Sequence, residues 1–449
     1  RDNLMTNADL SAKPNFNGWT TWKDGSTLTT GTVEGVMTAG EVWNAKADVH
    51  QTLTGLKNGV YELRANAATR PASNAFNAND NYIAYLYANN DENYIQALTE
   101  DMVSGDEAVD GVNCLLTPDA NGNVDDSLFI DDTYHYVPHG PVTCAYAFKA
   151  GRYENRVITN VTDGTLTVGL RIPETGLAND WIGFGNFRLF YLGSTDEATD
   201  LMSEGVNSYV ARANTLINYI GISDIPNSDD ETLPHYKSMP NFSAELRNEL
   251  QALVAATEGK NAEELLTICA QFTDIFHRID SCKEAYIELM DNALAMLDAC
   301  YNDPEAPQEE VVEMQNVVDD VVSGWEQGTF SIAEAKAMEA IKNTAFYQRY
   351  FQGAPALKGG FYQLETAGDM AWFANNVNSL GNTQLNAEIV APIDLADSQF
   401  SPIGTVATPY AGTFKGNLYP ITNANMMIFG TTQGATIDGI NVQGGSVGG

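Results

Sequence analysis

The sequence predicts a multidomain protein: a β-sandwich of the jelly-roll type, then an α-helical bundle, then the start of a parallel β-helix. With 449 residues, the chain is too long for one hydrophobic core. Apolar residues alternate in the first part and recur with a helical period in the middle. The last part consists of short apolar runs separated by Gly. These changes of pattern place the expected domains at 1–195, 196–355 and 356–449.

The first region is predicted to consist of β-strands. In "GTLTVGLRI" the apolar residues Leu166, Val168, Leu170 and Ile172 alternate with Thr, Gly and Arg, as in a half-buried strand. Other expected strands are rich in Val, Ile, Tyr, Phe and Thr and are bounded by turn residues. They are "GVYELRANAAT", "NYIAYLYANN", "CAYAFKA", "RVITNVT" and "NFRLFYLG". Many short strands in one region are typical of an antiparallel sandwich, most simply a jelly roll.

The middle region is predicted to be helical. From 199 to 221, apolar residues fall on one stripe of a helix, which indicates an amphipathic helix. Further helices are expected in 243–257, 307–325 and 331–341. The stretch 261–304 begins with a capping pattern and ends at a Pro. Because it is long for one helix, we expect a turn near "RIDSC". Four to six helices would form a bundle.

The last region begins with a predicted short helix and continues as short strands. Thr366 and Asp369 have the spacing of a capping box, and Met370, Phe373 and Val377 share one helical face. After this helix, apolar residues recur at close spacing between Gly residues, as in the coils of a parallel β-helix.

The chain is strongly acidic, with 23 Lys and Arg against 59 Asp and Glu and a formal net charge of -36. Binding to nucleic acid or to anionic lipid is disfavoured, because both require clustered positive charge. No stretch resembles a transmembrane helix. The five cysteines, Cys114, Cys144, Cys269, Cys282 and Cys300, fit no zinc motif. Disulfide bonds, including Cys114–Cys144, and buried thiols are both compatible with the sequence.

The first 193 residues resemble the jelly-roll, carbohydrate-module-like domain of surface proteins from Bacteroidales-type gut bacteria. The residues that carry this resemblance include "NADLS", "GWT", "EVWNAKADVHQTLTGLKNGVYELRANAATR", "YLYAN", "AGRYEN", "VTDGTLTVGLR" and "DWIGFGNFRLFYLG". That family usually carries Asp where this chain has Gly185. The resemblance implies contact with glycans.

Residues 364–449 resemble the start of a GLUG-type right-handed β-helix. The matching segments are "LETAGDMAWFANNVNSLGNTQLNAEIVAPIDL", "FSPIGT", "YAGTFKGN" and "GATIDGINVQGGSVGG". The helical region is similar to the variable spacers of such proteins. Together the resemblances imply an exported protein at the cell surface or outside the cell. With Arg1 first and no signal peptide, we expect a mature product whose partners are glycans, glycoproteins or other cell-surface proteins.

A sugar site needs aromatic faces and polar groups that orient hydroxyls. Trp22, Tyr134 and Tyr136 are the preferred candidates, because polar flanks and turn residues place them on loops. Trp19 and Trp181 are further candidates. For any single aromatic residue here, core packing is the competing interpretation.

The segment "PDANGNVDD" has the spacing of the beginning of a calcium loop, with oxygen ligands at Asp119, Asn121, Asn123 and Asp125. Val124 stands where an EF-hand has Gly, and no Glu closes the loop, so we favour a solvated turn over a metal site. We expect no cofactor. Related sandwiches often carry a structural calcium ion, so one elsewhere in this region is compatible with the sequence.

No nucleophile elbow, phosphate-binding loop or metal-ligand motif is present in the sequence. We therefore predict a non-catalytic protein that captures glycans, such as an adhesin. Two alternatives stay open. One is a polysaccharide lyase or glycosidase with its active site on the β-helix, although Lys415 is the one basic residue in 364–449. The other is a purely structural surface stalk.

Overall fold

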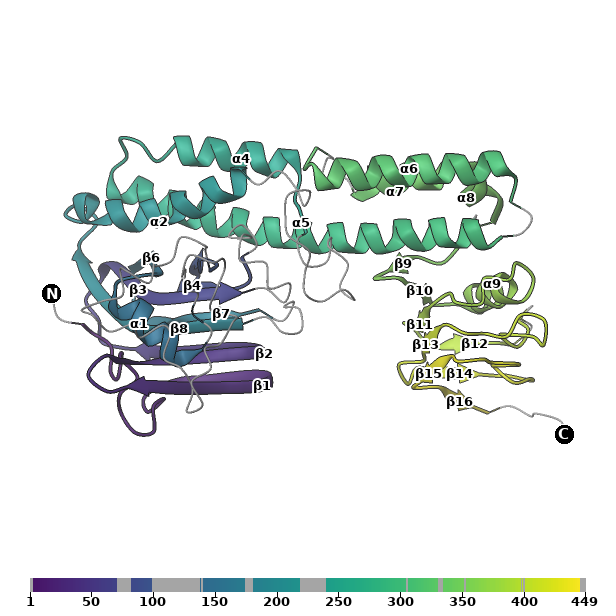
Figure 1. Ribbon diagram of the computed structural model, residues 1–449, viewed down its shortest axis with the longest axis horizontal. Coiled ribbons are helices and arrows are strands. Elements are labelled where there is room, and N and C mark those ends of the chain that lie inside the picture. The colour runs from purple at the N-terminus through teal and green to yellow at the C-terminus, as the bar shows by residue number, and fades with distance from the viewer. Residues whose placement is uncertain are drawn as a thin grey trace, which may run out of the picture. The chain divides into compact units, whose positions relative to one another are not determined.

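The computed structural model describes residues 3–70, 82–98, 138, 140–173, 181–218, 240–303, 306–329, 334–350, 353–396, 398 and 400–444. Within it the chain forms two compact units, Arg1–Ser281 and Cys282–Gly449, and the boundary falls inside one long helix. Figure 1 shows the elements of each unit. The domain boundaries expected at 195 and 355 stay predictions.

The first unit is built on antiparallel strands. Along the chain they are β1 (Thr20–Val33), β2 (Met37–Leu53), β3 (Gly59–Arg70), β4 (Tyr85–Ala88), β5 (Asp91–Tyr94), β6 (Glu154–Val161), β7 (Leu166–Ile172) and β8 (Trp181–Gly193). The order in the sheet is β5-β4-β7-β2-β8-β3-β6, and β1 pairs with β2. The strands expected in β3, β4, β6, β7 and β8 are therefore confirmed.

The long strand β2 makes this sheet sandwich-like. Strand β1 pairs along one edge of β2, so β7 and β8 share the other edge. Strand β7 pairs with residues 47–53 of β2, and β8 pairs with residues 40–43. The sheet divides at this point into a β7-β4-β5 part and a β8-β3-β6 part. The row formed by Val49, Leu170 and Leu86 is completely buried, so this face of β2, β7 and β4 belongs to the core.

The segment "CAYAFKA" is a helix, and the prediction of a strand there was wrong. Helix α1 (Pro141–Lys149) begins with Pro in its first turn, and Gly140 precedes it as the N-cap residue. Its buried residues Cys144, Ala145 and Phe148 recur with a helical spacing, and they pack against Trp181. Gly151, with a φ of 79°, follows the helix and permits the change of direction.

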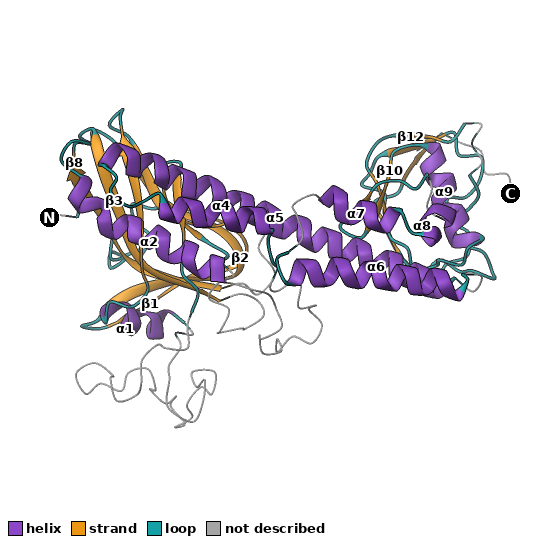
Figure 2. Ribbon diagram, turned by 90° about the horizontal axis from the view of Figure 1, so that it is seen from above, coloured by secondary structure: helices purple, strands orange, loops and turns teal. Residues whose placement is uncertain are grey.

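Helices α2 (Thr199–Asn218), α4 (Ala244–Ala255) and the first half of α5 (Ala262–Asn302) complete this unit. Figures 1 and 2 show them along one side of its strands. The stripe predicted for α2 is buried, at Met202, Val206, Tyr209, Ala213 and Leu216. Helix α5 runs without interruption through "RIDSC", so the expected turn was wrong. No Gly or Pro occurs between residues 262 and 302 to break it.

The second unit contains the remainder of α5 with α6 (Gln308–Glu326), α7 (Glu334–Lys342), α8 (Ala345–Tyr350) and α9 (Ala367–Asn378). Its strands are β9 (Leu357–Lys358), β10 (Phe361–Leu364), β11 (Ala387–Ile389), β12 (Ile393–Asp394), β13 (Thr413–Lys415), β14 (Pro420–Thr422), β15 (Thr436–Asp438) and β16 (Asn441–Gln443). Strands β10, β11, β13 and β15 pair in parallel, and so do β12, β14 and β16.

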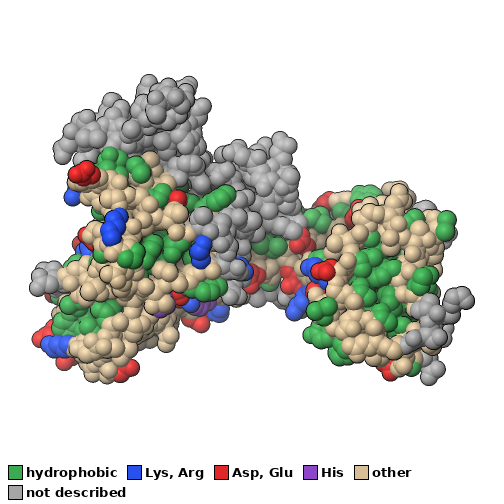
Figure 3. Space-filling model, turned by 90° about the horizontal axis from the view of Figure 1, so that it is seen from below, with side chains coloured by type: hydrophobic (Ala, Val, Ile, Leu, Met, Phe, Trp, Pro, Cys, Tyr) green, Lys and Arg blue, Asp and Glu red, His purple; other side chains and the backbone are tan. Residues whose placement is uncertain are grey.

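Parallel pairing stacks apolar side chains into columns. One column runs through Tyr362, Ala387, Phe414 and Ile437, which are 2%, 0%, 0% and 38% exposed. The column is therefore buried until its last member. Figure 3 shows hydrophobic side chains gathered on one face of this unit.

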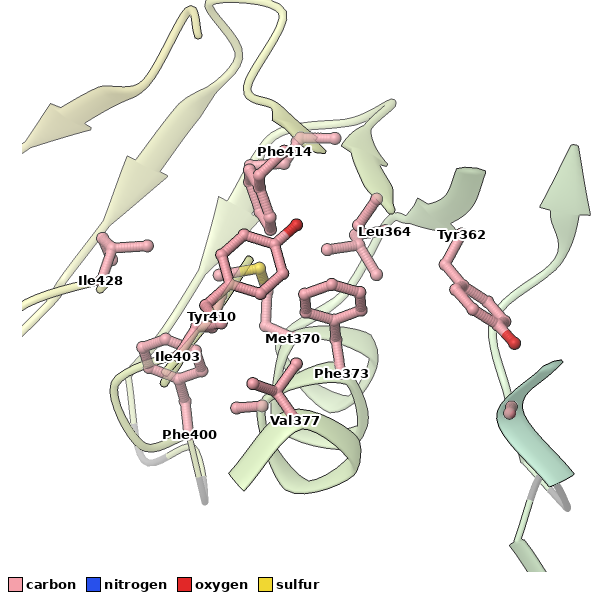
Figure 4. Packing of buried hydrophobic residues seen from close by; sticks show 14 of the residues in the cluster. Tyr362, Leu364, Met370, Phe373, Val377, Phe400, Ile403, Tyr410, Phe414 and Ile428 are labelled. Atoms are coloured by element: carbon pink, nitrogen blue, oxygen red, sulfur yellow. The ribbon is translucent and has the colours of Figure 1, made fainter. Parts of the chain in front are cut away.

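Helix α9 covers the beginning of these columns. The capping box is formed as predicted: Asp369 N donates to Thr366 Oγ1 over 3.2 Å, and Thr366 N donates to Asp369 Oδ2 over 2.9 Å. Met370, Phe373 and Val377 are completely buried, as their shared face predicts. Figure 4 shows this packing, in which the rings of Phe373 and Phe414 lie 5.8 Å apart, edge to face.

Four of the cysteines, Cys144, Cys269, Cys282 and Cys300, are buried as thiols. Cys114 lies outside the described residues. Of the two interpretations left open by the sequence, that of buried thiols holds for these four.

Candidate functional site

Three of the predicted ligand residues have defined positions. Trp22 is 46% exposed, but it lies within strand β1, where it pairs with Asp48, so the prediction of a loop at this position was wrong. Trp19 is buried; its ring packs against Phe187 with centroids 4.7 Å apart, and its Nε1 donates to a backbone oxygen. Trp181 is 1% exposed, and its Nε1 donates to Glu41 Oε2 over 2.8 Å. The rings of Trp19 and Trp181 thus belong to the core, and neither presents a face to a ligand.

The other predicted positions, Tyr134, Tyr136, Asp119, Asn121, Asn123 and Asp125, lie outside the described residues. Among the residues that are described, no group of three or more His, Cys, Asp or Glu side chains is placed to hold a metal ion.

Strand pairing places Trp22 in a row of polar and aromatic residues. Trp22 lies opposite Asp48 of β2, and Asp48 lies opposite Arg171 of β7. Arg171 lies opposite Tyr85 of β4, and Tyr85 opposite Tyr94 of β5. Directly opposite residues point to the same face of a sheet, with Cβ atoms about 5 Å apart. We call this side of β1, β2, β7, β4 and β5 the Trp22 face.

The next row on the Trp22 face runs through Thr20, His50, Gly169, Tyr87 and Glu92. Its middle position carries no side chain. A Cβ added at Gly169 would lie 2.2 Å from a backbone oxygen of β2, so the two strands approach each other too closely for any other residue.

Hydrogen bonds join the two rows around Asp48. The Tyr87 hydroxyl donates to Asp48 Oδ1 over 2.6 Å, and His50 Nδ1 lies 2.9 Å from the same oxygen. Burial raises the pKa of the Tyr87 hydroxyl, and its bond to Asp48 raises it further, so Tyr87 remains a donor at neutral pH. The Asp48 carboxylate is thereby held in one orientation while a third of its side chain stays exposed, at 33%.

Glu92 forms a second cluster on this face. Its side chain is 4% exposed, and its two carboxylate oxygens contact Arg171 Nη2 and His277 Nε2 of α5. The hydrogen bond to Glu92 raises the pKa of the His277 imidazole. Both oxygens of this nearly buried carboxyl group therefore have polar partners, as burial of a polar group requires.

Helix α5 covers the β4-β5 end of the Trp22 face. Tyr94 donates to Asp280 Oδ1 over 2.5 Å, and the Tyr85 hydroxyl contacts the other oxygen of the same carboxylate. The Tyr94 ring packs against Phe276 with centroids 4.6 Å apart. Tyr85 and Tyr94 are consequently buried, at 2% and 1% exposed.

The uncovered part of the face includes the aromatic ring of Trp22 and the polar side chains of Asp48, His50 and Arg171. Trp22 is 46% exposed, and the side chains of Asp48, His50 and Arg171 are 33%, 25% and 40% exposed. An indole face can stack on the C–H groups of a sugar ring, while a carboxylate, an imidazole and a guanidinium can orient its hydroxyls.

Asp48, His50 and Arg171 were not predicted as site residues. The alternation in "ADVHQ" indicates a strand with Val49 on its buried side, and so places Asp48 and His50 on the other side. Nothing local in the sequence indicates that Arg171, more than a hundred residues away, lies opposite Asp48.

A search of protein-family models finds no match to this chain. Curated proteins likewise include no match. Among solved structures, the chain is similar to TmCBM61, a carbohydrate-binding module in complex with β-1,4-galactotriose. Identity is 13%, the TM-score is 0.23, and the match covers 42% of this chain and 99% of that one.

A second similar structure is the enzymatically active domain of tailspike protein 4 from bacteriophage CBA120. It shares 14% identity with a TM-score of 0.21, and the match covers 42% of this chain and 21% of that one. Within the described residues, none of the helices is both long and apolar enough to cross a membrane.

Proposed function

We propose that this chain is a non-catalytic, exported protein that binds glycans through the Trp22 face and works at the cell surface or outside the cell. The observation that carries the proposal is the row of Trp22, Asp48 and Arg171, in which an exposed indole lies beside an oriented carboxylate and a guanidinium. Such a combination of one aromatic platform and a few fixed polar groups is what sugar recognition requires.

The electrostatics of the face favour glycans over other ligand classes. The chain has a formal net charge of -36, so polyanions are repelled at long range. Locally, Arg171 is paired with the buried Glu92, and Asp48 accepts from Tyr87. The pairing leaves polar atoms for hydrogen bonds without a surplus of positive charge, which suits a hydroxylated ligand.

We also propose finer identities for the two folds. The divided sheet of the first unit is a jelly roll, and the parallel ladders of the second unit are the first coils of a right-handed β-helix. Support for the second proposal comes from the two parallel ladders and from the buried columns that they stack. In this arrangement the first unit binds and the second serves as a stalk, with other surface proteins or glycoproteins as partners.

The absence of catalysis is part of the proposal. In the β-helical region, Lys415 is the one basic residue, and its Nζ lies 4.0 Å from the centre of the Phe361 ring. A lyase site would need basic side chains directed at a uronate, and a cation held over an aromatic ring is poorly placed for this. We propose no cofactor for the same region.

The test compares the wild-type chain with Trp22→Ala on an array of plant, host and microbial glycans. We expect Trp22→Ala to weaken binding about tenfold, because a lost stacking platform is worth about 1.4 kcal/mol. The matched control is Trp43→Ala: Trp43 is 43% exposed on β2 but points to the opposite side of that strand from Asp48.

His50→Gln, at a side chain that is 25% exposed on the same face, gives a second measurement and should also weaken binding. Equal losses in Trp22→Ala and Trp43→Ala would contradict the site, because they would show an effect of removing any exposed indole. Release of new reducing ends or unsaturated products from any of the polysaccharides would contradict the non-catalytic proposal.

A further inference from the structure

The second unit contains a cavity of about 370 Å³ between helix α5, the β9-β10 hairpin and the loop 381–386. This volume falls within the range of roughly 300–1,000 Å³ that is typical of small-molecule sites. Gly360 and Gly381 lie in its wall, and a Cβ added at either would meet nothing within 4 Å. The space beside these two glycines is therefore open.

The cavity has a buried floor and a polar rim. The floor includes Ala299 and Tyr362, which are 4% and 2% exposed. Asp298 and Asn302 of α5, with Gln384 of the loop, are exposed and form part of the rim. An apolar floor beneath hydrogen-bonding side chains matches a ligand with one apolar face and polar edges.

Asn382 also lines the cavity and lacks one hydrogen bond. It is 6% exposed, and its Nδ2 donates to Asn376 Oδ1 over 3.4 Å, which fixes which end of the amide is the oxygen. Its Oδ1 is buried and has no hydrogen-bond partner in the part of the chain that the structure describes. Because this oxygen has almost no accessible surface, a ligand in the cavity cannot reach it, and the exposed amides of Asn302 and Gln384 are the acceptors that remain beside Asp298.

The charge of the lining residues indicates which ligands the cavity can accept. Among the described residues that line the cavity, Asp298 alone is charged, so a uronate or a phosphate would be repelled. The exposed amides of Asn302 and Gln384 can each donate and accept. Hydroxyl groups also do both, whereas an ammonium group only donates, and the lining therefore fits a neutral hydroxylated ring better than an amine.

We propose that this cavity is a second ligand site that binds one neutral sugar residue, with Asp298 and the amide oxygens of Asn302 and Gln384 accepting from its hydroxyls. The site lies in the other unit from the Trp22 face, so this inference does not depend on the function proposed above.

The experiment uses the full chain carrying Trp22→Ala, so that binding at the Trp22 face does not obscure the result. Saturation-transfer NMR is recorded with methyl β-D-galactoside, methyl β-D-glucoside, glucuronate and glucosamine. We expect a signal from at least one of the two neutral glycosides and none from glucuronate.

Three variants in this background locate the signal. Ala295→Trp fills the cavity from the surface of α5 and should abolish binding. Leu294→Trp is the matched control, since Leu294 is the adjacent exposed residue and does not line the cavity. Asp298→Ala removes one acceptor from an exposed position and should weaken binding about tenfold without affecting folding.

Several results would overturn the proposal. One is that neither neutral glycoside binds. Another is that glucosamine alone binds, which would indicate an amine site at Asp298. A third is that binding persists unchanged in both Ala295→Trp and Asp298→Ala. If Ala295→Trp fails to fold, as judged by its melting temperature against Leu294→Trp, then Asp298→Ala decides the matter.

Discussion

At the scale of single residues, Glu92 shows how a nearly buried carboxyl group is provided with partners in this protein. Its carboxylate lies on the short strand β5, 4% exposed, with Arg171 on one oxygen and His277 on the other. Removing either partner would leave a nearly buried charge incompletely compensated, which is among the more destabilising changes in a protein. His277 comes from α5, so this pair also joins the helix to the sheet.

The His277–Glu92 pair makes stability depend on pH. In the folded state the hydrogen bond to Glu92 raises the pKa of His277. Burial acts in the opposite direction, but the pKa remains above its ordinary value. Because the folded pKa lies above the unfolded value of about 6.5, the stabilisation is fully present below that pH. It is lost as the pH rises through the raised folded pKa.

We therefore expect the His277–Glu92 pair to make the first unit more resistant to urea at a pH of about 6 than at about 8.5. The variant His277→Gln should lose that difference. The control Arg278→Gln alters the next residue of α5, whose guanidinium stays charged at both values, and should retain it. An unchanged pH dependence in His277→Gln would show that the pair does not contribute.

At the scale of elements, the residues at the start of helices α1 and α9 explain where these helices begin. Helix α9 begins at a complete capping box, whereas α1 begins with Gly140 and a Pro and was mistaken for a strand. The apolar residues of "CAYAFKA" alternate well enough to resemble a strand, and the Pro that favours a helix stands just before them.

The capping box of α9 leads to a prediction about stability. Thr366→Ala removes the side-chain acceptor for Asp369 N and should lower the free energy of unfolding of the second unit by about 1 kcal/mol. Thr366→Ser keeps the hydroxyl and should stay within about 0.5 kcal/mol of the wild type. Urea denaturation followed by circular dichroism measures both. Equal losses in the two variants would indicate that packing of the methyl group matters more than the cap.

At the scale of the whole molecule, the chain forms two compact units whose β-sheets are built differently. The first closes its core by dividing one antiparallel sheet, and the second adds similar layers in sequence. In a layered structure each layer depends on its neighbours on both sides. Burial along the columns reflects this: Ile421 is completely buried, whereas Val442, next in its column, is 49% exposed.

Hydrogen exchange should reveal this gradient. We expect the backbone amides of β15 and β16 to exchange faster than those of β11 and β13, because, among the strands that the structure describes, those of the last layer have a partner on one side only. Exchange measured by mass spectrometry on peptides from 385–391, 411–417 and 434–444 resolves these layers. Uniform protection in all three peptides would contradict a layer-by-layer distribution of stability.

The sequence by itself determined much of the local structure. The helical stripe of α2, the cap and buried face of α9, and the alternation in β7 were all predicted, because each depends on residues a few positions apart. The wrong predictions also come from reading short stretches of sequence in isolation. A turn in α5 was expected from length alone, although the segment contains no residue that breaks a helix.

Only the tertiary structure decided which residues could form a site. Trp19, Trp22 and Trp181 have similar side chains, yet the first and last are buried and Trp22 is exposed, since burial depends on what packs against each strand. Asp48 and Arg171 become neighbours through the register between β2 and β7. Alternation along a strand indicates the face of each residue, but which strands pair, and in what register, depends on contacts between distant parts of the chain.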